Sequence, residues 1–152
     1  MKSRTRARSL ALQVLYEVDM TGHLPGTVLQ ERLEESVSEG DQVALSPELV
    51  EFARQIISGV VPISEKLDLV IASYAPEWPF DQIAAIDRNI LRIATWEFAV
   101  STQTPLKVAI NEAVELAKLY GSDNAPRFIN GVLGSLADRE HEITQKLKKG
   151  AA

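Results

Sequence analysis

The chain has 152 residues, 45% of them apolar, and a formal net charge of −5 at pH 7. This length suits one domain with a substantial hydrophobic core, and the lack of a long uncharged apolar run excludes a membrane-spanning segment. There is no cysteine, and the two histidines lie far apart in the sequence, so we expect no disulfide, metal or other cofactor. These features, with no signal-peptide pattern after the basic N-terminus, favour a cytoplasmic protein.

The charges are distributed unevenly. Every charged residue before the first acid, Glu17, is basic, whereas the stretch 31–41 is acidic and the C-terminal end is basic again. Because salt confines the field of a charge to about 10 Å, a basic arm can bind phosphate even on an acidic protein. From the residues alone, RNA binding by this arm is about as well supported as a solvated tail. Its members are Lys2, Arg4, Arg6 and Arg8.

Apolar residues recur at steps of three and four through the N-terminal half, which predicts amphipathic helices. The first covers residues 4–21 and ends at Gly22, and a second covers residues 27–38 with an acidic outer face. Ser46 is a good N-cap for a third helix, which we expect Gly59 and Pro62 to break or bend. All of these elements have the polar outer face of surface helices.

The middle of the chain divides the predicted bundle. Ser64 is expected to cap a fourth helix, and the proline-rich stretch 76–79 is expected to form a rigid linker. We therefore predict a single all-helical domain over residues 1–152, with an N-terminal half of about 1–75 and a C-terminal half of about 80–148.

Residues 80–101 form the most apolar predicted helix and are expected to lie at the centre, touched from several sides. Glu97 falls beside its apolar stripe, so its burial would require a partner. Arg88 and Arg92 are expected together on the polar side. Asp87 is expected at the edge of the stripe, where a lone carboxylate adds little stability.

The stretch from Pro105 to Leu136 predicts a helix, a short loop and a second helix. Gly121 lies where a left-handed C-terminal stop is needed, and Ser122, Asp123 and Asn124 are each suited to cap the next helix. Gly131 and Gly134 are expected to leave room for a neighbouring helix.

The chain shows neither strand alternation nor catalytic motifs. A weaker apolar stripe with Ile143 and Leu147 follows the last predicted helix, and no hairpin signal separates β-branched runs. We predict an all-α fold, a compact bundle of about seven helices. No nucleotide loop, nucleophile elbow or metal-spaced pair is present, so an enzyme is not expected.

Four segments carry a family resemblance. VAINEAVELAKLYG followed by RFINGVLG resembles the C-terminal signature of the NusB family of bacterial transcription antitermination factors. DRNILRIATWEF and the N-terminal RARSLALQVLYE resemble the same family, in the family's order. The resemblance implies a NusB-like bundle that acts without catalysis.

The resemblance also implies a mechanism and its residues. Such a factor binds boxA-type single-stranded RNA of ribosomal RNA operons together with ribosomal protein NusE, and joins the RNA polymerase elongation complex with other Nus factors. Thr5 stands where some members carry another arginine. The expected RNA-binding residues are Lys2, Arg4, Arg6, Arg8, Gln13, Tyr16, Arg127 and Phe128. The expected partner-binding residues are Asp87, Arg88 and Asn124.

Several of these residues can also be explained by purely structural roles. Tyr16 and Phe128 stand at helical spacing, where aromatic residues usually belong to the core, and Asp87 is also explained as a surface acid. Asn111, Glu112 and Asn130 read as buried or half-buried hydrogen-bonding groups between helices.

The alternative function is a helical interaction module without its own RNA specificity. A similar domain precedes the catalytic domain of certain rRNA cytosine methyltransferases. Some family members are monomers and others homodimers, and the sequence does not decide between these states.

Overall fold

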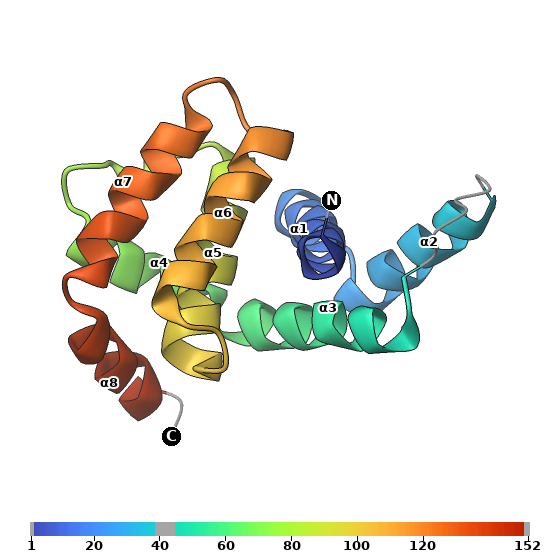
Figure 1. The fold of residues 1–152 in the computed structure, drawn as a ribbon, viewed down its shortest axis with the longest axis horizontal. Helices are drawn as coiled ribbons and strands as arrows, with labels where there is room; N and C mark the ends of the chain where they lie inside the picture. The colour runs from blue at the N-terminus through green and yellow to red at the C-terminus, as the bar shows by residue number, and fades with distance from the viewer. Residues whose placement is uncertain (1, 39–44, 151–152) are drawn as a thin grey trace.

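The structure, a computed structural model, describes residues 2–38 and 45–150 (Figure 1). The described residues form eight α-helices and no strand, which confirms the predicted all-α fold class. The eighth helix contains the weaker apolar stripe predicted near the C-terminus, and Ile143 and Leu147 of that stripe are both buried. The helices are α1 (Ser3–Thr21), α2 (Pro25–Ser38), α3 (Pro47–Val60), α4 (Ser64–Tyr74), α5 (Ala85–Trp96), α6 (Leu106–Tyr120), α7 (Ala125–Ala137) and α8 (Glu140–Gly150).

Helix α5 lies at the centre of the bundle, as predicted. It packs against α1, α3, α4, α6 and α7, and its Ile90 and Leu91 are fully buried. The predicted helix 80–101 is interrupted at both ends, however. Residues Phe80–Gln82 form a separate 3-10 turn, and Glu97–Ser101 form a π-helical turn that ends at Thr102, whose φ is +56°. Wider π turns of this kind shift the side chains that follow relative to the helix axis.

Helix α1 buries one face and exposes the other. Its inner face packs against α3, α5 and α6, and Figure 1 shows it between α6 on one side and α2 on the other. The predicted end of this helix at Gly22 is confirmed: Gly22 is left-handed, with a φ of +76°, and its backbone N–H donates to the Val18 carbonyl. The opposite face, with Tyr16 and Met20, is exposed.

Several predictions about glycines are wrong. Gly121 is extended, with φ −89° and ψ 178°, so it is not a left-handed stop. Gly131 faces the ring of Trp78, and Gly134 has open space beside it, so neither glycine admits a neighbouring helix. By contrast, the predicted break at Gly59 and Pro62 is confirmed, because α3 ends at Val60 and the 3-10 turn Val61–Ile63 follows it.

The N-cap prediction at the third helix is confirmed, because the Ser46 hydroxyl accepts a hydrogen bond from the Leu49 backbone N–H at 3.3 Å. The N-cap prediction at Ser64 is wrong, because Ser64 is the first residue of α4 and its hydroxyl donates to the Val61 carbonyl. Across the described ranges, no helix combines the length and the apolar character that crossing a membrane requires.

Candidate RNA and partner interface

The basic N-terminus is the first two turns of α1 and not a free arm. Lys2 and Arg4 are exposed and Arg6 is half-buried, whereas Arg8 is only 2% exposed. The Arg8 guanidinium donates to both carboxylate oxygens of Glu97, with Nη2–Oε1 at 2.7 Å and Nε–Oε2 at 2.9 Å. The expectation that Arg8 presents its charge to RNA is therefore wrong: the group is in the core.

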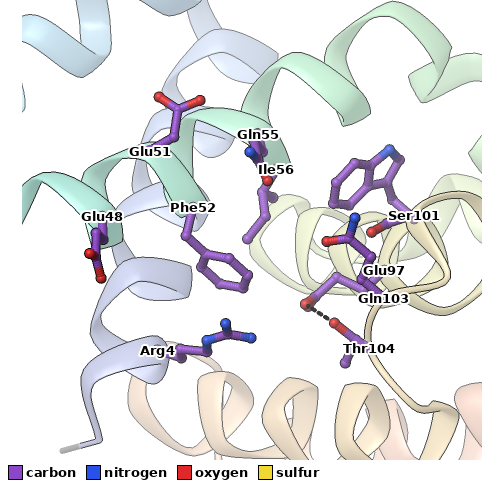
Figure 2. Close-up of a pocket in the computed structure, with 11 residues that line it drawn as sticks. Arg4, Glu48, Glu51, Phe52, Gln55, Ile56, Glu97, Ser101, Gln103 and Thr104 are labelled. Carbon is purple, nitrogen blue, oxygen red and sulfur yellow. Dashed lines mark hydrogen bonds between the residues drawn. The ribbon is translucent and has the colours of Figure 1, made fainter.

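Glu97 anchors a buried polar network, so the predicted need for a partner is confirmed. Its Oε1 also accepts a hydrogen bond from the Thr104 hydroxyl at 3.0 Å (Figure 2). Glu112 lies 3.7 Å from Arg8, and the Thr5 hydroxyl donates to it at 2.8 Å. The network ties the start of α1 to the π-helical turn and to α6.

The three polar residues expected between helices differ from one another in the structure. Glu112 is half-buried and bonded, as expected, whereas Asn111 and Asn130 are exposed. These two asparagines therefore lie on the outside of the bundle and do not set the register of the helices.

Arg4 lies over the ring of Phe52 in α3, with 4.8 Å between the guanidinium carbon and the ring centroid. Arg8 contacts the same ring at 5.0 Å. Figure 2 shows Arg4 beside Phe52 at the mouth of a small hollow that also has Glu48 and Gln103 on its walls. Phe52 thereby fixes the position of the exposed guanidinium of Arg4.

The outer face of α1 presents Tyr16, which is 38% exposed, so the alternative of a core tyrosine is wrong. One turn earlier, the nitrogen and the oxygen of the Gln13 side-chain amide are both bonded within the protein. Its Nε2 donates to the Tyr120 hydroxyl at 3.0 Å, and its Oε1 accepts from Arg32 Nη1 at 2.9 Å. Sequence reasoning missed Tyr120, whose only signal was an aromatic residue directly before the glycine that ends α6.

A second feature is a hollow of about 440 Å³ between the start of α5 and the start of α7. It brings together three of the predicted site residues, Asp87, Asn124 and Phe128. Phe128 is half-buried and packs edge to face on Trp78, with 6.2 Å between the ring centroids. The full lining is Trp78, Pro79, Gln82, Ile83, Ala84, Asp87, Ser122, Asn124, Ala125 and Phe128.

Asp87 is not the exposed rim residue that the sequence predicted. It is 8% exposed, and its Oδ1 is buried with no hydrogen-bond partner anywhere in ranges 2–38 and 45–150. Burial raises the pKa of this carboxyl group above the ordinary aspartate value. A buried acceptor without a donor is costly, so the hollow suits a donor from outside the chain.

Arg88 does not reach this hollow. It points to α1, where its Nη2 donates to Asp19 Oδ2 at 2.6 Å. Arg92 donates to both oxygens of Asp68 at 2.7 Å and also lies 3.3 Å from Asp19 Oδ2. The two arginines therefore lie together on acidic partners, as expected, although Arg92 is buried. Although burial acts to raise the pKa of Asp19, hydrogen bonds from Arg88 and Asn89 lower it overall. Arg88 thus holds α5 to α1.

Asn124 and Arg127 lie at the exposed start of α7. Asn124 occupies the N-cap position, but no capping bond from its side chain is present in the described part of the chain. Its expected role as a side-chain cap is therefore wrong. Arg127 is exposed directly beside the half-buried Phe128.

Comparison of the sequence with known proteins identifies the family of this chain. A model of the NusB family matches residues 5–138. The chain belongs to the NusB family. It is 46% identical over 141 residues to the transcription antitermination protein NusB of Roseiflexus sp. (strain RS-1), covering 91% of this chain and 94% of that protein. It is 44% identical to the NusB protein of Chloroflexus aggregans, with 90% and 87% covered.

Solved NusB structures have the same fold. The chain superposes with a TM-score of 0.77 and 27% identity on a chain from a crystal structure of antitermination factors NusB and NusE in complex with dsRNA, covering 91% of this chain and 98% of that one. It superposes on T. maritima NusB with a TM-score of 0.75 and 29% identity, covering 91% and 96%. The NusB family is one of transcription antitermination factors and not of enzymes.

Proposed function

We propose that this NusB protein binds the boxA element of nascent ribosomal RNA together with a NusE-type ribosomal protein. The RNA contacts α1 and the start of α7, and the partner docks at the Asp87 hollow. The pair then joins the RNA polymerase elongation complex with other Nus factors, in the cytoplasm, and favours readthrough of ribosomal RNA operons. The observation that carries this proposal is the Asp87 carboxylate in a hollow walled by aromatic rings, because its Oδ1 is buried and has no hydrogen-bond partner among the described residues.

The partner half of the proposal follows from the chemistry of the hollow. Trp78 and Phe128 supply the aromatic surface that interface cores favour, and Asp87 supplies a carboxylate whose Oδ1 has no donor within residues 2–38 and 45–150. A partner that binds ribosomal RNA is expected to be basic, so a cationic or N–H donor from it would complete the site. The related crystal structure holds a NusB protein together with NusE.

The RNA half rests on surface chemistry. Lys2, Arg4 and Arg6 supply positive charge at one end of α1, and the exposed ring of Tyr16 lies further along the same helix. Phosphate contacts by arginine and stacking of unpaired bases on aromatic rings are the usual means of binding single-stranded RNA.

The deciding experiment is a fluorescence anisotropy titration of labelled boxA RNA with the purified protein, with and without NusE. A scrambled RNA of equal length and composition is the control. We expect preference for boxA and tighter binding when NusE is present. Binding of NusE without any RNA preference would instead support a helical interaction module.

Replacing Arg4 and Arg6 with alanine together is expected to weaken RNA binding while leaving the thermal melt close to that of the wild type. Each lost phosphate contact lowers the slope of log affinity against log salt by about one. The matched control is Arg139→Ala on α8, which also removes an exposed arginine. An unchanged affinity and salt slope in the double variant would show that these residues do not meet phosphate.

Asp87→Asn is expected to stabilise the free protein near neutral pH and to weaken its complex with NusE. The pKa of Asp87 is raised in the folded state, so the folded wild-type protein holds the proton more tightly than the unfolded chain does. The wild type therefore loses stability as pH rises from the unfolded-state pKa through the folded-state pKa. The variant's advantage should therefore vanish below about pH 4, where the carboxyl is protonated in both states.

The two effects of Asp87→Asn are measured separately, by urea melts across pH 3–8 and by calorimetric titration with NusE. A partner affinity equal to that of the wild type would place Asp87 outside the interface. A variant that is less stable than the wild type at pH 7 would show that the ionised carboxylate has a stabilising partner.

A further inference from the structure

We propose that Tyr120 is an additional RNA-contacting residue, whose ring stacks on an unpaired base between the α1 and α7 parts of the RNA surface. Gln13 then acts as the positioning residue for this ring and not as an RNA contact. This inference deepens the proposed RNA binding and rests on it.

The first argument is that the ring of Tyr120 is exposed and is held in place. Tyr120 is the last residue of α6, and it is 37% exposed, almost the same as Tyr16. Its hydroxyl accepts a hydrogen bond from Gln13 Nε2 at 3.0 Å. A tyrosine held at its polar tip, with part of its ring open to solvent, presents an apolar face at little cost in conformational entropy.

The second support is its position. The other proposed RNA contacts fall into two groups, one on α1 and one at Arg127 and Phe128 on α7. The residue after Tyr120, Gly121, packs so closely on the start of α7 that a β-carbon there would overlap the methyl group of Ala125. Tyr120 therefore touches α1 through Gln13 and adjoins α7 through Gly121. The ring of Tyr120 is thus placed to meet an RNA strand that contacts both groups.

The third support concerns Gln13, whose amide is already engaged on both sides. Its oxygen accepts from Arg32 on α2, and Arg32 is itself held by Glu17 at 3.3 Å. These two bonds fix the orientation of the Gln13 amide between Tyr120 and Arg32, with one N–H and one oxygen lone pair left over. Its effect on RNA passes through the ring that it holds.

Base stacking on an exposed ring is tolerant of sequence because every base has a π face. The ligand that fits Tyr120 is therefore a single unpaired nucleotide of the bound RNA, of any base. Loss of one such platform lowers affinity by roughly tenfold.

The direct test is photo-crosslinking of the wild-type protein to boxA RNA carrying 5-iodouridine, followed by mapping of the crosslinked peptides. We expect crosslinks at Tyr120 as well as at Tyr16. In Gln13→Leu the crosslink at Tyr120 should fall while that at Tyr16 persists, a selective loss that general destabilisation would not produce.

Affinity measurements provide the second test. Tyr120→Leu is expected to bind boxA RNA about tenfold more weakly. Tyr120→Phe keeps the ring but loses the hydroxyl that Gln13 holds, so it should weaken binding less than Tyr120→Leu and about as much as Gln13→Leu. Leu119→Ala is the matched control, because it removes an exposed apolar side chain from the same turn.

The outcomes separate this inference from the proposed function. Crosslinks at Tyr16 but none at Tyr120, or a Tyr120→Leu variant with wild-type affinity, would overturn the role of Tyr120 and leave RNA binding standing. Failure of the wild type to prefer boxA would overturn both. Should Tyr120→Leu fail to fold, the wild-type crosslinks decide.

Discussion

Arg8→Ala is expected to destabilise the protein by about 3–5 kcal/mol, the range for removing one partner of a buried ion pair. The variant leaves the Glu97 carboxylate, which is 2% exposed, without its two charge-assisted hydrogen bonds. The Thr104 hydroxyl alone cannot replace a guanidinium that donates to both oxygens. Urea denaturation, followed by far-UV circular dichroism, measures the loss.

Two variants make this expectation specific. Arg4→Ala removes a neighbouring arginine of the same helix, but an exposed one over Phe52, and should cost no more than about 1 kcal/mol. The double variant Arg8→Met with Glu97→Leu removes both charges and should recover most of the stability, because apolar pairs often replace buried ion pairs without loss. A single variant Arg8→Ala as stable as Arg4→Ala would show that the Arg8–Glu97 pair is not buried in solution.

The difference between Arg8 and its neighbours shows what the sequence could not reveal. Periodicity placed the start of α1 correctly and identified Glu97 as a residue that needs a partner, because both follow from spacing within a segment. The identity of that partner depends on a contact between residues 89 positions apart. Only the folded arrangement of α1 against the π-helical turn decides which basic residue pairs with Glu97.

The candidate partner site shows the same division. Asp87, Asn124 and Phe128 came from matching segments to a family, and the structure brings them to one hollow. Their environments were not predictable, since the burial of Asp87 depends on packing against the loop after α6. The close approach of Gly121, where an added β-carbon would lie 3.3 Å from Asp87 Oδ1, is a contact between elements that local patterns do not encode.

Gly59→Ala is expected to lower the free energy of unfolding by about 1–3 kcal/mol, although alanine is the better helix former. A β-carbon at this position would overlap Cε2, Nε1 and Cζ2 of the Trp96 indole. The ring would have to leave its place between α3 and the end of α5, where it lines the hollow beside Phe52. The cost of that displacement exceeds the propensity gain of up to about 1 kcal/mol.

Gly134→Ala is the matched control for Gly59→Ala, because the same change is made inside a helix and nothing lies within 4 Å of the added β-carbon. With no clash, the helix propensity term remains, and this variant should be more stable than the wild type by about 0.5–1 kcal/mol. The two glycine variants are thus expected to shift the melting temperature in opposite directions. Displacement of Trp96 should also shift the tryptophan emission of Gly59→Ala alone. If both variants melt above the wild type, α3 and Trp96 have room that the structure does not show, and Gly59 is only a weak point in its helix.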